Sequence, residues 1–533
     1  MKRRRGKVLL IGIVAIGLGA LIWFSLPPRE PKYGDLSLTQ LTWYLSTDNF
    51  PNRPTWEDLF FAEHGIWSIG TNGVPFLISN IKNQPSPWIE KLRYRLDKSP
   101  LPKLQNLLPV DCSSEAASAF QVFGPLAKPW LPELESLTTN SRPEIASAAL
   151  WAINSIRDED ACSIHMRFLD NPNLHIQRMA IAGIGDLGWR GREAVPQLIT
   201  MTQSTNSESA KLAAMALCGI SISPETTIPV LVDRLRGAER WEANILMRGI
   251  ARFGTSAEKY LPLIQQAFTN QWGAMAATQI LSGIRFEMVD GAIIRGPVKE
   301  KRIALTFTAH EFGEGGETIL DDLDRHKSKA SFFLTGDFLA NSNFQPVVDR
   351  MKSEGHLVGP HSDKHLLYCS WDSARKTLIS RHEFRRDFLD NVRRIAPEEL
   401  RESIYGGPPA SRGTSYLLPP FEHYNRDIAD WTHELGRTLI NFTPGTRSHA
   451  DYTGEADTNF VSSQAIFDSI LKREREDPHG LNGFILLLHL GSGPGRQDKF
   501  HTRFGELLDV LAGKGYQFVR VDELLEPPKE ETR

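Results

Sequence analysis

Four short segments near the C-terminus, each with a distinctive composition, constrain the fold of this chain most strongly. They span residues 303–311, 330–336, 361–365 and 484–489. The apolar runs have the length of strands, and the first, third and fourth segments carry groups that bind metals or transfer protons. In a parallel α/β protein, ligands gather at the carboxyl ends of the strands. The order therefore predicts that these polar groups converge at one end of a parallel sheet or barrel.

Length and composition indicate a folded protein with more than one domain. A chain of 533 residues exceeds an ordinary single domain, so two or three are expected. Its 41% hydrophobic and 23% charged residues are typical of globular proteins. The formal net charge of −3 predicts no nucleic-acid partner. The four cysteines are scattered and match neither a zinc motif nor a disulfide framework.

The N-terminus has the pattern of a membrane anchor. Five basic residues within positions 2–7 precede an uncharged apolar run at 8–26, which is long enough to cross a bilayer as a helix. The basic cluster favours the cytoplasmic side. Residues 1–30 are therefore predicted to form a transmembrane anchor, with the bulk of the chain periplasmic or otherwise extracytoplasmic. The alternative is a cleaved signal peptide, although no Ala-x-Ala site follows the apolar run.

A repeat follows a predicted spacer at residues 31–69. Prolines at 132, 196, 229 and 262 each lie in an apolar–Pro–x–apolar pattern, and the last three recur every 33 residues. Proline is tolerated in the first turn of a helix, and alanine-rich stretches between the prolines allow neighbouring helices to pack closely. Residues 70–283 are therefore predicted to form an α-solenoid of HEAT-like repeats. An irregular helical bundle is the alternative.

The pattern changes after residue 290. From 291 to 525, strand-like runs alternate with charged helical stretches, which predicts a parallel sheet or barrel with helices outside. Residues 526–533 read as a polar tail. The glycine-rich residues 491–496 lack the Lys-Ser/Thr of a phosphate-binding loop.

Three histidines in this region are candidates for chemistry. His361 and His365 follow a short apolar run, and imidazoles at this spacing can share one divalent ion. The chain has fifteen histidines, so the spacing alone is weak evidence, and two surface histidines are the alternative. His489 ends a buried-type apolar run, where a satisfied core histidine is the usual case.

Taken together, the motifs resemble the polysaccharide deacetylase family (carbohydrate esterase family four) over residues 291–525. The resemblance implies a distorted (β/α) barrel and metal-dependent removal of acetyl groups from sugars. It also implies metal ligation by His361 and His365, proton donation by His489, and Zn²⁺ as the metal, with Co²⁺ or Ni²⁺ as alternatives.

The first motif departs from the family pattern. Where the family has Thr-Phe-Asp-Asp-Gly, this chain has Thr308 and Ala309 in place of the two aspartates. His310 and Glu311 follow and are chemically competent. We predict His310 as the third metal ligand and Glu311 as the base; the swapped roles and an inactive site stay open.

The substrate-binding segments also diverge. Leu418 stands where the family has the arginine of Arg-Pro-Pro-Tyr. Glu422 is predicted to line the pocket, and Asp451 and Tyr452 are predicted to wall the sugar site.

These inferences combine into one functional prediction. The chain is expected to be a metal-dependent hydrolase that removes N- or O-linked acetyl groups from a cell-envelope or extracellular polysaccharide. The solenoid is expected to offer a surface to a protein partner. The alternatives are a catalytically inactive glycan-binding or scaffold protein that acts through the solenoid, and a metal-free hydrolase of a C–N amide bond.

Overall fold

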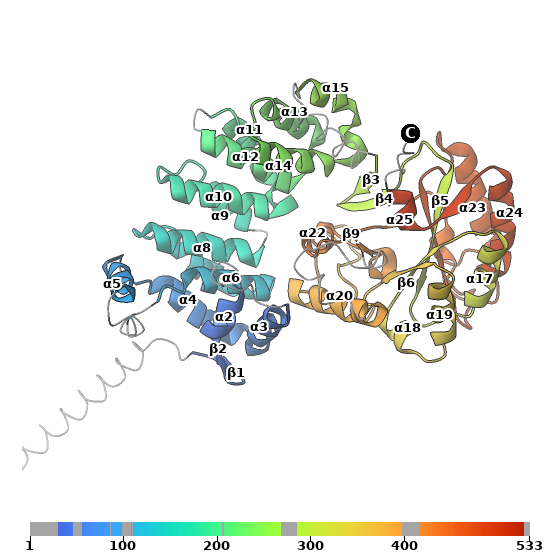
Figure 1. The fold of residues 1–533 in the computed structure, drawn as a ribbon, viewed down its shortest axis with the longest axis horizontal. Coiled ribbons are helices and arrows are strands. Elements are labelled where there is room, and N and C mark those ends of the chain that lie inside the picture. The colour runs from blue at the N-terminus through green and yellow to red at the C-terminus, as the bar shows by residue number, and fades with distance from the viewer. Residues whose placement is uncertain are drawn as a thin grey trace, which may run out of the picture. The chain divides into compact units, whose positions relative to one another are not determined.

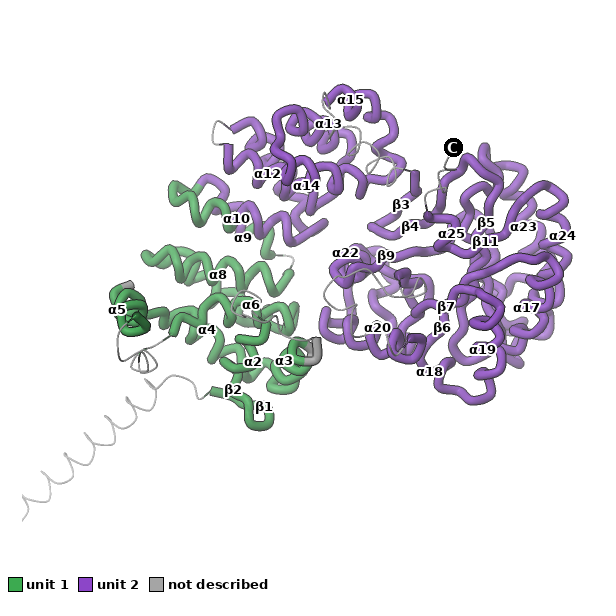
Figure 2. Tube along the Cα trace, in the orientation of Figure 1, with its two compact units in different colours: residues 1–164, 171–179 green, residues 165–170, 180–533 purple. Residues whose placement is uncertain are grey.

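The computed structural model describes residues 30–45, 56–85, 87–98, 108, 110–158, 160–204, 207–267, 285–396 and 415–526. The chain divides into two compact units (Figure 2). The first comprises residues 1–164 and 171–179, and the second comprises residues 165–170 and 180–533.

The prediction of a membrane anchor is corrected. In the part of the chain that the structure describes, no helix is both long enough and apolar enough to span a bilayer. Residues 8–26, on which the prediction rested, lie outside the described ranges, as do residues 527–533 of the predicted tail. The predicted membrane attachment, and the extracytoplasmic location derived from it, therefore lack support in the structure.

The described residues between 38 and 267 are mainly helical, after a short hairpin of β1 (Lys32–Tyr33) and β2 (Leu36–Ser37). Alanines let the helices approach closely: Ala116 and Ala117 of one helix and Ala149 and Ala152 of another are fully or almost fully buried. The helical elements are α2 (Leu38–Leu45), α3 (Trp56–Ile69), η2 (Gly70–Gly73), α4 (Val74–Lys82), α5 (Pro87–Asp97), α6 (Ser113–Phe123), η4 (Gly124–Trp130), α7 (Leu131–Leu137), α8 (Pro143–Ile156), α9 (Ala161–Met166), α10 (Leu174–Asp186), η5 (Gly188–Ala194), α11 (Val195–Met201), α12 (Ser207–Ile220), α13 (Pro224–Leu235), α14 (Arg240–Ala251), η6 (Gly254–Tyr260) and α15 (Leu261–Ala267).

The proline pattern corresponds to a recurring local structure. Pro132 and Pro196 each occupy the second position of a short helix, α7 and α11, where the missing N–H costs no hydrogen bond. Pro229 differs, since it lies inside α13. The 3₁₀ turns η4, η5 and η6 each begin with a glycine at positive φ, a conformation that disfavours other residues. The assignment to HEAT repeats stays a prediction.

The C-terminal part contains a seven-stranded sheet in the order β3-β4-β10-β5-β6-β7, with β11 also paired to β5. The pairs among β5, β6, β7, β10 and β11 are parallel, whereas β4 is antiparallel to β3 and β10. The strands are β3 (Glu287–Val289), β4 (Ala292–Arg295), β5 (Arg302–Ala309), β6 (Ser331–Leu334), β7 (Leu357–Pro360), β10 (Phe484–His489) and β11 (Gln517–Val519).

Two further short strands close the sheet into a barrel. β8 (Tyr416–Leu417) and β9 (Thr438–Leu439) pair in parallel. The Leu418 amide donates to the Pro360 carbonyl beside β7, and Ile440 bridges to Ile293 of β4. The ring therefore runs β10-β5-β6-β7-β8-β9-β4, with irregular pairing at the two short strands. This geometry confirms the predicted distorted barrel.

Helices cover the outer face of this barrel (Figure 1). Those after β5 and β10 pack their apolar faces on the strands in one continuous buried cluster. The helical elements of this part are α17 (Gly316–Arg325), α18 (Gly336–Ala340), α19 (Gln345–Ser353), α20 (Arg381–Ile395), η9 (Pro420–Glu422), α22 (Arg426–Glu434), η10 (Ser448–Ala450), α23 (Ser463–Glu476), η11 (Phe500–Arg503), α24 (Phe504–Gly513) and α25 (Val521–Leu525).

Candidate active site

Strand alternation decides which side chains face the barrel interior. Leu305 and Phe307 of β5 pack into the outer cluster with the helices, whereas Ala304 packs into a separate inner cluster. Because successive side chains of a strand point to opposite faces, Thr308 faces the interior and Ala309 faces the helices. The same alternation directs His489 inward from β10, where Leu488 belongs to the outer cluster.

Three of the predicted histidines lie together at the carboxyl ends of β5 and β7. The ring centroids of His310 and His365 are 4.4 Å apart, and those of His361 and His365 are 5.3 Å apart. The structure thus brings together the three residues predicted as metal ligands. His361 donates its Nδ1–H to the Leu418 carbonyl at 2.8 Å, and His310 Nδ1 lies 3.2 Å from the Thr335 hydroxyl.

Burial keeps two of these rings neutral. It lowers the pKa of His361 to about 3 and that of His365 to about 2, and the neighbouring imidazoles add to the effect. Neutral imidazole is the form that ligates metals, because the ring nitrogen must offer a lone pair. A hydrogen bond from Nδ1 to a carbonyl, as His361 makes, also orients Nε2 of a metal-binding histidine.

The side chains of this site are of the types that bind a divalent metal. Zn²⁺ takes neutral imidazole and carboxylate ligands, and both occur here. Among the described residues, however, no three His, Cys, Asp or Glu side chains are already grouped at a spacing that could hold an ion. The rings of His310 and His365 instead stack at an interplanar angle of 23°. The residues therefore fit a divalent metal chemically, although they do not form a ready-made ligand cage.

Glu422 is the carboxyl group that lies against this histidine cluster. Its Oε1 is 3.9 Å from Nε2 of His361. Burial raises the pKa of Glu422 to about 7, and the Asp451 charge adds to this, whereas His489 and the nearby Thr308 hydroxyl oppose it. That hydroxyl is buried and makes no hydrogen bond of ordinary geometry, although it lies close enough to affect Glu422.

Backbone conformation directs Glu422 into the site. Phe421 and Glu422 have φ values of 58° and 52°, in the left-handed region that residues other than glycine rarely adopt. The Asn441 side-chain amide donates to the Glu422 carbonyl at 2.7 Å. The Phe421 ring lies 4.2 Å from that of His365. The turn is thus held by contacts on both sides.

His489 is paired with Asp451 on the opposite side of the site. Nδ1 of His489 donates to Asp451 Oδ1 at 2.6 Å, and the His489 backbone N–H donates to Oδ2 at 2.9 Å. Burial opposes protonation of the ring, but the Asp451 carboxylate together with the Glu422 charge outweighs it and raises the pKa of His489 above its ordinary value. Asp451, predicted to wall the sugar site, thus holds the candidate acid. Tyr452, half exposed, lies against the same ring.

The acidic residues after β5 have other surroundings. Glu311 is exposed. Glu314 accepts the backbone N–H groups of Ser492 and Gly493 and pairs with Lys499, so it fixes the glycine-rich loop. Glu317 is exposed and pairs with Arg350.

Sequence reasoning missed the residues that hold the histidine loop. On α20, Asn391 accepts the His361 backbone N–H at 2.8 Å, and Asp387 accepts those of Asp363 and Lys364. Both lie on the helix face that also buries Phe384 and Phe388. Polar residues four apart on an otherwise apolar helix face were the available signal, because buried polar groups need partners.

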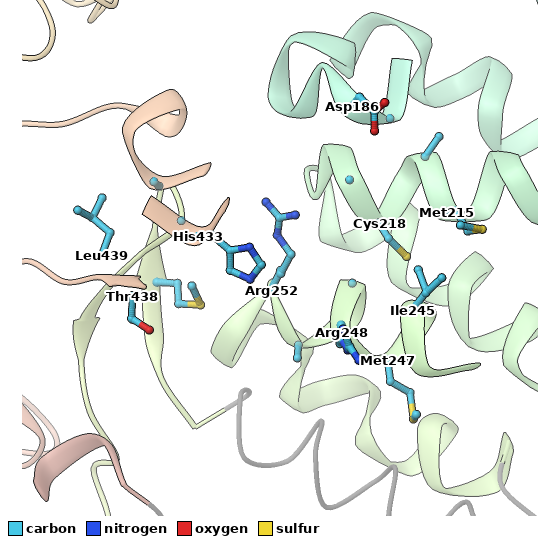
Figure 3. A pocket seen from close by; sticks show the side chains of 18 of the residues that line it. Asp186, Met215, Cys218, Ile245, Met247, Arg248, Arg252, His433, Thr438 and Leu439 are labelled. Carbon is cyan, nitrogen blue, oxygen red and sulfur yellow. The ribbon is translucent and has the colours of Figure 1, made fainter. Parts of the chain in front are cut away.

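A separate cavity of about 630 Å³ lies within the second unit (Figure 3). Its walls combine helices α12 and α14 with β3, α22 and β9, and Arg252 and His433 approach each other across it. None of the residues predicted for catalysis lines this cavity, so it is distinct from the candidate active site.

Known proteins match the barrel part of the chain. Residues 295–440 match the family model described as polysaccharide deacetylase. A peptidoglycan-N-acetylglucosamine deacetylase of Bacillus cereus is 24% identical over 235 residues, which cover 44% of this chain and 72% of that protein. The peptidoglycan-N-acetylmuramic acid deacetylase PdaA of Bacillus subtilis is 26% identical over 236 residues, covering 44% and 75%. A solved chitin deacetylase structure from Colletotrichum lindemuthianum is 22% identical, with a TM-score of 0.33, covering 46% of this chain and 96% of that one.

The fold and site define a (β/α) barrel with a histidine cluster, a buried carboxyl group and an Asp-paired histidine at one end. Within that class, the sequence match is specific. The match of residues 295–440 to the polysaccharide deacetylase model, with the similarity to these deacetylases, confirms the resemblance found from the motifs. The helical residues before 295 lie outside the matched region.

Proposed function

We propose that this protein is a metal-dependent hydrolase that removes N- or O-linked acetyl groups from a polysaccharide. The observation that carries the proposal is the gathering of His310, His361 and His365 beside the His489–Asp451 pair. The named activities of the relatives, which act on peptidoglycan and chitin, support the same substrate class.

The histidine cluster would hold the metal. His310, His361 and His365 are the proposed ligands, and Zn²⁺ is the proposed ion, with Co²⁺ or Ni²⁺ as alternatives. A bound divalent ion would supply Lewis-acid polarisation of the acetyl carbonyl and lower the pKa of a bound water.

His489 is the proposed general acid. Its Nδ1–H is committed to Asp451, so Nε2 carries the proton that is available for transfer. When the acetyl C–N or C–O bond breaks, this proton would pass to the departing amine or alkoxide of the sugar. Tyr452 is the proposed wall against which the sugar packs, since it is half exposed beside His489.

Acetate release tests the proposal. The full chain would be assayed on N-acetylated chitopentaose, acetylated xylan and purified peptidoglycan, before and after chelation, with Zn²⁺, Co²⁺ or Ni²⁺ restored. We expect release from at least one probe, loss on chelation and recovery with metal. We expect His361→Ala/His365→Ala to lose both metal and activity. Chelated protein that retains full activity would favour the metal-free amide hydrolase, and no release from any probe would overturn the proposal.

Two sequence-based assignments stay predictions. Glu311 is the sequence-based candidate for the base, and a protein partner is predicted for the helical part.

A further inference from the structure

The candidate site needs a carboxylate that the first motif does not supply. Thr308 faces the barrel interior but carries no basic group, and Ala309 faces the helices. Glu314 and Glu317 are engaged with Lys499 and Arg350. Hydrolysis of an acetyl group needs a group that takes a proton from the attacking water.

Glu422 meets this need from a different part of the barrel. It belongs to η9, which follows β8, and its side chain is only 11% exposed. Oε1 lies 3.9 Å from Nε2 of His361, the nitrogen that is not bonded to the Leu418 carbonyl. The buried hydroxyl of Thr308 lies beside the Glu422 carboxyl group. Glu422 thus lies next to the position that the first motif leaves without a carboxylate.

The backbone conformation of the turn at Phe421 and Glu422 directs the Glu422 side chain into the site. Two successive residues, Phe421 and Glu422, hold left-handed backbone conformations. Such strain persists only where surrounding contacts fix it, and it concentrates at functional sites. Here Asn441 bonds the Glu422 carbonyl, and Phe421 packs on His365.

We infer that Glu422 is the catalytic base of the proposed deacetylation, in place of the exposed Glu311. The carboxylate takes a proton from water as the water oxygen bonds to the acetyl carbon. The C–N or C–O bond to the sugar then breaks, and His489 protonates the leaving amine or alkoxide. The products are acetic acid, which ionises to acetate, and the free amine or hydroxyl; Glu422 then loses its proton to solvent, and His489 regains one from solvent. This inference rests on the proposed function.

The test compares two carboxylates by isosteric replacement in the full chain. Acetate release from chitopentaose, acetylated xylan and peptidoglycan would be measured for Glu422→Gln and Glu311→Gln, with the exposed Glu476→Gln of α23 as the control for the chemical change. We expect kcat to fall by about 100-fold or more only in Glu422→Gln, the usual contribution of a positioned base. Zn²⁺ affinity, measured by calorimetry on chelated protein, and the melting temperature separate this loss from lost metal or lost folding.

A relocation variant keeps the test decisive if Glu422→Gln is unstable. Thr308→Asp/Glu422→Gln places a carboxylate on the neighbouring inward-facing position of β5. We expect kcat of this double variant to exceed that of Glu422→Gln by at least about tenfold, because a base acts through its position. Wild-type activity retained by Glu422→Gln, or lost in Glu311→Gln alone, would overturn the inference but leave the function standing. Wild-type protein inactive on all three probes would overturn both.

Discussion

His489 depends on Asp451 for its orientation and for much of its tendency to stay protonated. Asp451 accepts both the Nδ1–H and the backbone N–H of His489, so it fixes the ring orientation, the tautomer and the charge together. Although the ring is buried, the carboxylate raises the pKa of His489 above its ordinary value. A raised pKa increases the protonated fraction of the ring at a given pH, which favours donation to a poor leaving group.

Replacing Asp451 should therefore change the pH profile as well as the rate. In Asp451→Asn the pKa of His489 falls, so the protonated acid is lost at lower pH. We expect kcat to fall by about 10- to 100-fold and the alkaline limb of the kcat profile to move to lower pH. The pH dependence of kcat would be measured by acetate release for Asp451→Asn. The exposed Asp468→Asn of α23 is the control. An unchanged alkaline limb would contradict the pairing.

Arg496, unlike His489, has a structural role. It lies in the glycine-rich segment 491–496 and is completely buried. Its guanidinium donates to the backbone carbonyls of Thr453, Val461 and Asp498. The residue therefore ties three loop segments together, and the segment forms a structural loop, in agreement with its lack of a phosphate-binding motif.

At the scale of elements, the helices α9 and α10 pack through a very small residue. Gly183 of α10 lies against His165 of α9 so closely that a Cβ there would be 2.5 Å from the imidazole. Burial lowers the pKa of His165 to about 4, and neither ring nitrogen has a hydrogen-bond partner among the described residues. The helix pair thus encloses a neutral imidazole.

This neutral histidine should make the helical region sensitive to acid. Below pH 6.5 the His165 imidazole is protonated in the unfolded chain but stays neutral in the folded state. The free energy of unfolding therefore falls as the pH drops from about 6.5 towards 4. The difference is on the order of 3 kcal/mol. Urea unfolding at pH 7 and pH 4.5 should show a smaller acid loss in His165→Phe than in wild type. Equal losses in the two proteins would refute the assignment.

The strands show how much a pattern of alternation predicts. In β5 and β10 the apolar runs placed the strands correctly, and side-chain alternation together with the two core clusters assigns Thr308 and His489 to the interior. Their parallel arrangement was also expected from the alternation of strands and helices, whereas their order in the sheet was not predicted. The short strands β8 and β9 carried no such signal, because two residues are too few to display a period.

At the scale of the whole molecule, buried and half-buried ion pairs join helical segments to the barrel within the second unit. Asp427 at the start of α22 accepts the Arg190 guanidinium, the Trp189 indole N–H at 3.2 Å and the Thr377 hydroxyl. Arg252 donates to Asp430 on the same helix at 2.7 Å. Burial opposes ionisation of Asp427, but the Arg190 contact outweighs it and lowers its pKa.

Breaking the Asp427 pair should weaken the whole second unit. Asp427→Asn keeps the shape but leaves the Arg190 charge poorly compensated, so we expect a loss of about 3 kcal/mol in the free energy of unfolding. Urea unfolding followed by tryptophan fluorescence measures this, with the exposed Asp324→Asn as the control. A midpoint equal to that of wild type would show that the pair adds no net stability.

The sequence by itself determined the strand segments of the barrel, the resemblance of the C-terminal part to polysaccharide deacetylases, and His310, His361, His365 and His489 as its candidate groups. These features are local, since the period of a strand, the order of the segments in the sequence and the spacing of the motifs can be read directly from the sequence. Tertiary structure decided which groups meet. Glu422 reaches His361 because barrel closure brings β8 beside β7 and a left-handed turn directs the side chain inward. Asp451 lies 38 residues from His489 in sequence and meets it only after folding. Such contacts depend on how distant segments pack, which no local pattern records.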